Sequence, residues 1–237
     1  MTAITQAIIL AGGLGTRLRS VVSEVPKPLA PVAGRPFLDW LLDDLHAHGL
    51  RRLILATGYG SDQIENRYRP GYRGMEVVIS REGEPLGTGG AIKLACTQAN
   101  QGPLLVLNGD TFAAWTAAPL LEAANATQAP ITLGLKHMVA PDRYGTVALN
   151  GPRITAFHEK RPMPTGIINA GVYLINPAIV PWPTEARFSL ERDVLEPVCA
   201  SGSLAGAVLD GPFIDIGIPE AFREAQTAIP NWIQTPP

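Results

Sequence analysis

The first half of the chain alternates short apolar runs with segments whose apolar residues recur at helical spacing. Phe37, Trp40, Leu41 and Leu45 fall on one helical face, and Gly49 follows as a C-cap. The pattern predicts strands over 7–11, 53–57, 76–80 and 104–108, and helices over 37–48, 62–67 and 89–99. Alternating strands and helices predict an α/β fold with a mostly parallel sheet, covered by helices on both sides.

The second half changes character, because its strand-like runs are joined by short connections. Such runs favour antiparallel pairs in a β-rich section. The pattern predicts strands over 131–136, 145–149, 153–159 and 171–175, and helices over 189–199 and 219–226. We expect one domain over 1–237, with a first half to about residue 130, a β-rich second half over about 131–228, and a Pro-rich, frayed tail over 229–237.

A glycine-rich segment, Leu10-Ala11-Gly12-Gly13-Leu14-Gly15-Thr16-Arg17, follows the first predicted strand, and Pro26-Lys27-Pro28 lies just downstream. Glycines allow successive backbone N–H groups to turn toward one anion, and Arg and Lys add positive charge. The motif matches neither a Walker A loop nor a complete dinucleotide fingerprint. It predicts a polyphosphate site, and the alternative is a plain strand-to-helix turn.

Three loops leave the carboxyl ends of predicted strands, over 11–28, 82–90 and 109–112. Ligands of parallel sheets bind at this edge, so the three motifs belong to one rim. Asp110 ends the strand over 104–108, and Asp215 lies inside an apolar run. The two carboxylates could hold one Mg²⁺, which takes one or two carboxylates plus phosphate oxygens. The alternatives are a turn for Asp110 and a salt bridge for Asp215.

The second glycine-rich loop, over 84–91, opens a predicted helix and could bind an anion or let a flat base lie on bare backbone. Glu84 could accept the N1–H and amino protons of guanine, and its alternative is an exposed loop carboxylate. Glu159-Lys160 follows a predicted strand, and Asn169 leads into the next one. Glu and Asn suit sugar hydroxyls and Lys suits a phosphate, whereas a plain hairpin turn is the alternative for each segment, including 142–145.

Composition narrows the class of protein. The 237 residues carry a net charge of −2 without a basic block, which argues against nucleic acid as a partner. The two cysteines, Cys96 and Cys199, form no CxxC pair, so a disulfide or zinc site is not expected. No apolar stretch approaches the roughly 20 residues of a membrane span, and no signal peptide is visible. We expect a cytoplasmic protein without a membrane partner.

Taken in order, these motifs resemble those of the sugar-1-phosphate nucleotidyltransferases, from about residue 7 to residue 225. The resemblance implies a Rossmann-like three-layer αβα fold with a mixed, mostly parallel sheet and a β-rich sugar-binding section. It also implies that the first half, to about residue 130, is the nucleotide-binding half and that 131–228 is the sugar-phosphate-binding half. Two departures stand out. Arg161 precedes Pro162 where the family often has Pro directly after Glu-Lys, and Gly217-Ile218-Pro219 replaces the Gly-Thr-Pro of many members.

The resemblance implies transfer of a nucleotidyl group from GTP to a sugar 1-phosphate, with Mg²⁺ as cofactor. Within the family, the chain is most similar to guanylyl-transferring members that act on manno-configured heptose phosphates. The implied catalytic residues are Arg17, Lys27 and Asp110, and the implied metal ligands are Asp110 and Asp215. The implied nucleotide-binding residues are Leu10, Ala11, Gly12, Gly13, Gly15, Thr16, Arg17, Lys27, Glu84, Gly87, Thr88, Asn108 and Gly109. The implied sugar-phosphate-binding residues are Gly145, Glu159, Lys160 and Asn169.

Several alternatives stay open at this point. Mannose 1-phosphate with GTP, or N-acetylmuramate phosphate with UTP, would keep the fold and change the substrates. A catalytically silent regulatory subunit that binds a nucleotide sugar belongs to another class. The resemblance implies no separate regulatory domain, and the oligomeric state is left open with a homodimer as the ordinary case.

Overall fold

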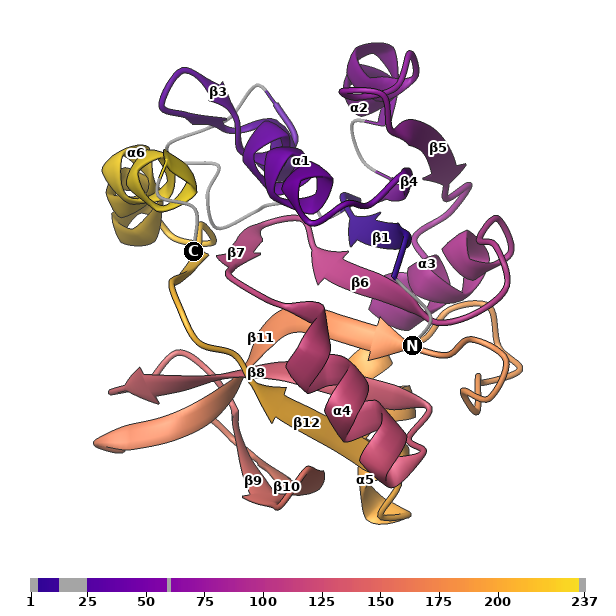
Figure 1. Ribbon diagram of the computed structural model, residues 1–237, viewed down its shortest axis with the longest axis vertical. Coiled ribbons are helices and arrows are strands. Elements are labelled where there is room, and N and C mark those ends of the chain that lie inside the picture. The colour runs from indigo at the N-terminus through magenta and orange to yellow at the C-terminus, as the bar shows by residue number, and fades with distance from the viewer. Residues whose placement is uncertain (1–3, 13–24, 59–60, 235–237) are drawn as a thin grey trace.

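The computed structural model describes residues 4–12, 25–58 and 61–234, and a nine-stranded sheet lies at its centre (Figure 1). The strands are β1 (Gln6–Leu10), β4 (Arg52–Thr57), β5 (Glu76–Arg81), β6 (Leu104–Asn108), β8 (Ile131–Val139), β9 (Thr146–Asn150), β10 (Arg153–His158), β11 (Thr165–Ile175) and β12 (Leu204–Val208). Their order across the sheet is β5-β4-β1-β6-β11-β8-β12-β10-β9.

Parallel pairing joins β5, β4, β1 and β6, as the alternating pattern of the first half predicts. The sheet then turns antiparallel, because β11 runs opposite to both β6 and β8. Parallel pairing returns between β8 and β12, and the β9–β10 pair is antiparallel. The sheet is therefore mixed, with its parallel block in the first half and its antiparallel block in the second.

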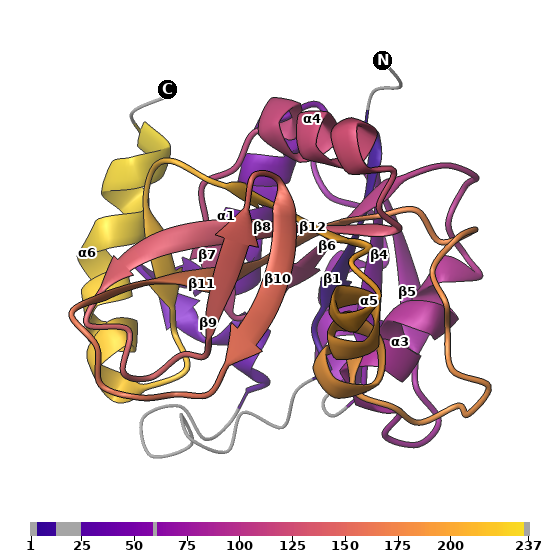
Figure 2. The ribbon, with the colours of Figure 1, turned by 90° about the horizontal axis from the view of Figure 1, so that it is seen from below.

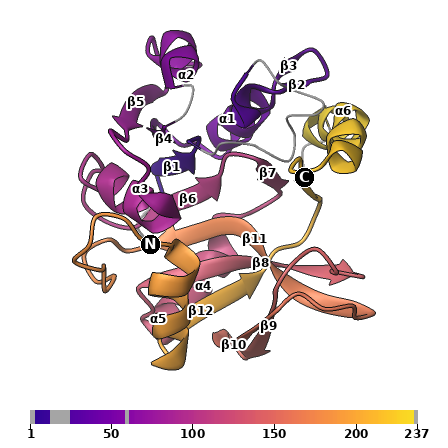
Figure 3. The same cartoon turned by 180° about the vertical axis from the view of Figure 1, so that it is seen from behind.

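Helices cover both faces of the sheet. They are α1 (Phe37–Ala47), α2 (Ser61–Tyr68), α3 (Gly87–Cys96), α4 (Ala117–Thr127), α5 (Glu196–Ala200) and α6 (Pro219–Gln234). Successive residues of β1 point to opposite faces: Ile9 packs in a core with residues of α1, α4 and α6, and Ile8 in a second core with residues of α3 and α5. Figure 1 shows α1 and α4 in front of the sheet, and Figure 3, from behind, shows α3 and α5. This confirms the predicted three-layer α/β fold.

Small elements complete the architecture. The hairpin β2 (Pro31–Val32) with β3 (Arg35–Pro36) precedes α1, and β7 (Thr111–Ala113) pairs with β13 (Phe213–Asp215) outside the main sheet. The 3₁₀ turn η1 (Lys27–Leu29) and the π-helical turn η2 (Glu191–Leu195) lie near the site described below. None of the helices in the described ranges is long and apolar enough to cross a membrane.

Most predicted elements are confirmed to within a few residues, and two predictions need correction. The strand expected from residue 171 begins at Thr165, so Asn169 lies inside β11, where the register with β8 shifts. Neither α4 nor β12 was expected from the pattern. α4 is rich in alanine, and β12 contains two alanines and a glycine, so their hydrophobic periodicity is weak.

The predicted frayed tail is wrong over residues 229–234, because α6 continues to Gln234 through Pro230. Ile229 is fully buried in the core, and the ring of Trp232 lies 5.9 Å from that of Phe112. Tertiary packing of this kind outweighs the cost of a proline inside a helix. Figure 2 shows α6 running along one side of the molecule.

A polar network anchors α1 to α2 in the first half, away from the ends of β1 and β6. The Asp39 carboxylate is buried and accepts hydrogen bonds from the Tyr68 hydroxyl at 2.6 Å and from the Arg67 guanidinium at 2.6 Å. Asp43, one turn further along α1, accepts from Arg35 at 2.8 Å and from Tyr72 at 2.8 Å. These bonds hold the helices that support the parallel strands.

Candidate active site

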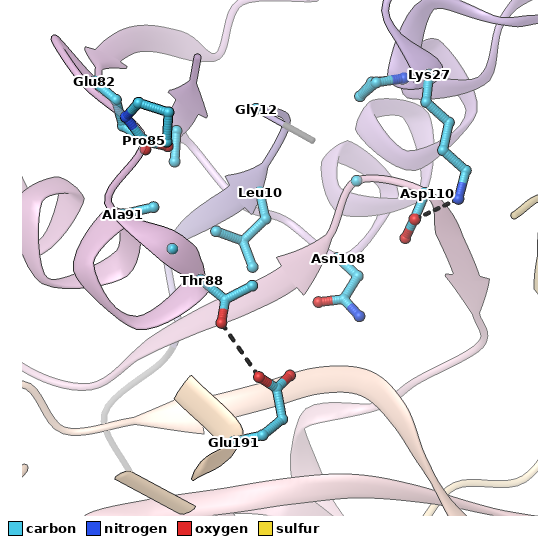
Figure 4. A pocket seen from close by; sticks show the side chains of 14 residues that line it. Leu10, Gly12, Lys27, Glu82, Pro85, Thr88, Ala91, Asn108, Asp110 and Glu191 are labelled. Carbon is cyan, nitrogen blue, oxygen red and sulfur yellow. Dashed lines mark hydrogen bonds and ion pairs between the residues drawn. The ribbon is translucent and has the colours of Figure 1, made fainter. Parts of the chain in front are cut away.

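A cavity of about 380 Å³ lies at the carboxyl ends of the parallel strands, as expected for this class of sheet (Figure 4). Many of the residues that the sequence assigned to a nucleotide site line it together. They are Leu10, Gly12, Lys27, Gly87, Thr88, Asn108, Gly109 and Asp110. Gly13, Gly15, Thr16 and Arg17, the rest of the glycine-rich segment, lie outside the described residues.

The ends of β1 and β6 meet at Gly109. Its N–H donates to the Leu10 carbonyl at 3.0 Å, and a Cβ atom at this position would lie 2.3 Å from that same oxygen. Only glycine therefore lets the two strands end so close together. This contact places Asn108 and Asp110 beside the segment that follows β1.

Lys27 stands at one end of the cavity, held by η1 between two prolines. Its Nζ lies 2.5 Å from Asp110 Oδ2 and 3.7 Å from Asp215 Oδ1. The lysine side chain is only 11% exposed, so both interactions are partly shielded from water. Figure 4 shows the Lys27–Asp110 pair at the edge of the cavity.

The β7–β13 pair brings Asp215 to this cluster. Asp215 lies opposite Thr111 in that short ladder, and the Ile216 N–H donates to the Asp110 carbonyl at 3.0 Å. The Gly217 N–H donates to Asp215 Oδ1 at 2.7 Å and fixes the carboxylate. Two residues 105 positions apart in the sequence thus face one ammonium group. We refer to Lys27, Asp110 and Asp215 as the Lys27 cluster.

Asp215 also meets a second set of donors from the segment before β9. Arg143 lies 3.6 Å from Asp215 Oδ2, and the Tyr144 hydroxyl donates to the same oxygen at 3.5 Å. Burial, followed by the charge of Asp215, raises the pKa of Tyr144 to about 12, so its hydroxyl stays protonated at neutral pH. Arg143 belongs to the segment 142–145, and no role for it was predicted from the sequence.

The residues of the Lys27 cluster also show whether a metal ion would fit there. Asp110 and Asp215 supply two hard oxygen donors at one point, which suits Mg²⁺ when phosphate oxygens complete the coordination. In the part of the chain that the structure describes, no three His, Cys, Asp or Glu side chains gather into a metal-binding group. The cluster therefore fits a cation that arrives with its phosphate ligands.

Another carboxylate, Glu82, reaches the cavity from the loop after β5. Glu82 lines the cavity, and its Oε2 accepts from the Leu86 N–H at 2.7 Å. Glu84, two residues on, is exposed and is not among the lining residues. The sequence signal was available, because Glu82 directly follows a parallel strand, where ligands of such sheets are bound.

Close packing requires a glycine at position 87 of the same loop. Gly87, the first residue of α3, has φ of +73°, and a Cβ there would lie 2.6 Å from the Phe188 carbonyl oxygen. Glycine is thus required for α3 to begin against the 186–190 segment. This contact joins the first half of the chain to the second beside the cavity.

The predicted sugar-phosphate residues lie apart from the cavity lining. Asn169 donates from Nδ2 to the Tyr173 hydroxyl at 2.9 Å and accepts from the Gly171 N–H at 3.0 Å, inside β11. Gly145 lies just before β9, and Glu159 and Lys160 are exposed in the loop after β10. Ala11, which was predicted to bind the nucleotide, is fully buried beside the site. The predicted binding roles of these five residues stay predictions.

Glu191 is a lining residue that sequence reasoning missed. It begins η2, and its carboxylate accepts from the Thr88 hydroxyl at 3.2 Å across the cavity wall (Figure 4). A single Glu at the start of a helical segment belongs to no motif, so the sequence alone gave no signal. Pro28, Ala56, Pro85 and Ala91 complete the lining.

The fold and this phosphate-suited site define a nucleotidyltransferase. Residues 6–231 match the family described as Nucleotidyl transferase, and the chain belongs to that family. D-glycero-alpha-D-manno-heptose 1-phosphate guanylyltransferase from Aneurinibacillus thermoaerophilus is 42% identical over 229 residues, which cover 96% of this chain and 100% of that protein. The enzyme of the same name from Campylobacter jejuni is 38% identical, over 92% of this chain and 96% of its own.

A solved structure has the same architecture. HddC from Yersinia pseudotuberculosis, complexed with GMP-PN, superimposes with a TM-score of 0.84 at 35% identity. The superposition covers 94% of this chain and 98% of that chain. The predicted family resemblance is confirmed by these findings.

Proposed function

We propose that the protein transfers GMP from GTP to D-glycero-α-D-manno-heptose 1-phosphate, giving GDP-heptose and pyrophosphate. The observation that carries the proposal is the Lys27 cluster at the strand ends, beside a cavity of a size that holds a nucleotide. Similarity over nearly the full length to two heptose 1-phosphate guanylyltransferases supports the choice of substrates.

The transfer is a displacement at the α-phosphorus of GTP. An oxygen of the sugar phosphate forms a bond to this phosphorus, the bond to the bridging oxygen breaks, and pyrophosphate leaves with the electron pair. The attacking phosphate is already ionised at neutral pH, so no general base is needed. The protein must bring two polyanions together and stabilise the charge that develops.

Lys27 is suited to this task. Its ammonium is partly buried between Asp110 and Asp215, where its interaction with a phosphate is weakly screened. Two acidic partners also fix the position of the lysine ammonium before substrate arrives. Arg17 is proposed as the second phosphate-binding cation on the basis of the motif.

We also propose Mg²⁺ as the cofactor, held by Asp110 and Asp215. When bound with the triphosphate, it would neutralise phosphate charge. The same carboxylates contact Lys27 in this structure, so the residues that would hold the cation also position the lysine ammonium.

Glu82 supports the choice of guanine. Its Oε2 accepts from the Leu86 N–H, and its Oε1 lies 3.2 Å from the point where a Gly12 Cβ would lie. Each carboxylate oxygen has two lone pairs, so Oε2 keeps acceptor capacity beside Oε1, and the carboxylate can accept both the N1–H and the amino protons of guanine. Uracil and cytosine cannot offer that pair of donors. HddC, complexed with GMP-PN, is consistent with this reading.

The biological setting follows from the product. A nucleotide-activated heptose is a glycosyl donor, so we propose a role in the synthesis of surface polysaccharide. GTP and sugar phosphates are cytoplasmic metabolites, and we place the reaction there. These two proposals rest on the chemistry of the substrates.

Pyrophosphate release with Mg²⁺ tests the proposal directly. The assay pairs GTP, CTP, UTP and ATP with heptose, mannose and glucose 1-phosphates and with N-acetylmuramic acid phosphates. Release confined to GTP with manno-configured sugars, and greatest with heptose, is the expected result. Another base or sugar would replace the proposed substrates. Nucleotide binding without release anywhere would favour a silent regulatory subunit.

A further inference from the structure

Glu191 is the carboxylate at the end of the cavity away from the Lys27 cluster, and the mechanism above gives it no role. It lies on the wall that the second half of the chain contributes, opposite Thr88 of α3 (Figure 4). A carboxylate would repel the phosphates of either substrate. It is suited to an uncharged, hydroxyl-rich part of a ligand.

Two hydroxyl groups fix the orientation of this carboxylate. Thr88 Oγ1 accepts from the Leu190 N–H at 2.9 Å, so its proton is directed to Glu191 Oε2 at 3.2 Å. Ser189 Oγ accepts from the Arg192 N–H at 3.3 Å and donates to the same Oε2 at 3.1 Å. A hydroxyl has one proton to donate, so both donors are committed to one oxygen.

The other oxygen, Oε1, is left for a ligand. Within residues 4–12, 25–58 and 61–234, no hydrogen-bond partner of Glu191 Oε1 is present. The carboxylate is held in place at an exposed position on the wall of a cavity, with one acceptor satisfied and the other open. A site that is preorganised in this way gains the full strength of a charge-assisted hydrogen bond.

The position of Glu191 relative to β11 indicates which hydroxyl it meets. The buried Tyr173 hydroxyl accepts from Asn169, the predicted sugar contact. Asn169 also accepts from the Gly171 N–H, and a Cβ at Gly171 would lie 2.7 Å from Nδ2 of Asn108, which lines the cavity. The β11 segment that carries Asn169 therefore adjoins the cavity that Glu191 lines. Burial raises the pKa of Tyr173, and the charge of Glu191 raises it further.

We propose that Glu191 is a specificity-determining residue that accepts a hydrogen bond from a ring hydroxyl of the sugar phosphate. The inference rests on the proposed function, because it deepens the choice of sugar at that site. Thr88 and Ser189 are positioning residues, since they act by holding the carboxylate.

The test compares wild type with Glu191→Ala and Glu191→Gln, and Glu196→Gln on the same helical segment serves as the control. Glu196 is exposed and outside the cavity lining. The expected loss in kcat/KM for the sugar phosphate is roughly ten- to a hundredfold for the alanine variant. The glutamine variant should lose less, because it keeps a neutral acceptor. KM for the nucleotide should stay within about twofold in every variant.

Deoxy analogues of the sugar phosphate separate a direct contact from a structural role. With the analogue that lacks the contacted hydroxyl, wild type and Glu191→Ala should become equally active. If every analogue shows the same loss as the full substrate, Glu191 does not contact the sugar. A rise in KM for the nucleotide alone would assign Glu191 to the ribose, which also overturns the proposal.

Ser189→Ala tests the positioning. Removing one of the two donors should weaken sugar selectivity in the same direction as Glu191→Gln, with the effect again confined to the sugar phosphate. Ser189 also caps its helical segment, so the melting temperature is measured in parallel. Unchanged selectivity in a folded variant would remove Ser189 from this role.

Failure of the proposed function and failure of the Glu191 proposal give different results. Wild type alone reports on GTP and heptose 1-phosphate, whereas the ratio of variant to wild type reports on Glu191. The ratio is measured on whichever sugar phosphate wild type accepts. If wild type binds without turnover, calorimetric affinities for the same sugar phosphates replace kcat/KM and decide the proposal in the same way.

Discussion

The two halves of the chain contribute unequally to the site. The first half supplies most of the cavity lining, including the strand ends, Lys27 and the carboxylates of Asp110 and Glu82. The second half supplies two carboxylates, Glu191 in the lining and Asp215 beside Lys27. Backbone N–H groups and an ammonium group suit phosphates, whereas carboxylates suit a metal ion or hydroxyl groups. The comparison indicates that the site is assembled between the two halves, through the Lys27–Asp215 and Thr88–Glu191 contacts.

The largest expected effect is at the Lys27 end. Lys27→Ala should lower kcat by on the order of 10²–10³-fold, because it removes a preorganised cation from the developing charge. It should also lower the Mg²⁺ concentration needed for half-maximal rate, since Lys27 no longer competes for Asp110 and Asp215. Steady-state pyrophosphate release over a Mg²⁺ series measures both. A kcat near the wild-type value would contradict the proposed role of Lys27.

Base selectivity is the next effect. Glu82→Gln should lower the GTP-to-UTP ratio of kcat/KM by roughly ten- to a hundredfold, because the charged acceptor for guanine is lost. Glu84→Gln is the matched control, since Glu84 lies in the same loop but outside the cavity lining. Competition assays with both nucleotides give the ratio. A loss in Glu84→Gln but not in Glu82→Gln would restore the sequence-based assignment.

A third prediction separates fold stability from catalysis in the first half of the chain. Asp39→Asn should lower the free energy of unfolding by about 1–3 kcal/mol, because Tyr68 and Arg67 lose a buried charged acceptor. Asp62→Asn, which breaks an exposed pair with Arg81, should cost no more than about 1 kcal/mol. Urea unfolding measures both. The kcat per folded molecule should not change, and a large fall would mean that the network shapes the cavity.

The smallest effect is the pH dependence of fold stability that comes from Tyr144, beside Asp215. Burial and Asp215 raise the pKa of Tyr144 to about 12, whereas an exposed tyrosine titrates near about 10. The stabilisation from neutral Tyr144 is therefore complete below about pH 10 and is lost as the pH rises toward 12. Tyr144→Phe should show a flatter decline of melting temperature over that range. Parallel curves for wild type and variant would contradict this account.

Much of the first half was predictable because its signals are local. A strand buried on both faces reads as an apolar run, and a ligand-binding loop follows its carboxyl end, so β1, β6, Lys27 and Asp110 could be placed on one rim. The second half was harder. Asn169 was expected before a strand and lies inside β11. The alanine-rich α4 and the short β12, with its small residues, had too little periodicity to be recognised.

The sequence by itself determined the α/β class, the parallel block of strands and the place of the glycine-rich motif after β1, since each depends on neighbouring residues. Only the tertiary structure decided that Asp215 meets Lys27, that Glu82 faces the cavity in place of Glu84, and that Glu191 meets Thr88. It also decided that α6 continues past Pro230. Contacts between distant residues depend on how strands pair and helices pack, and no local pattern encodes that geometry.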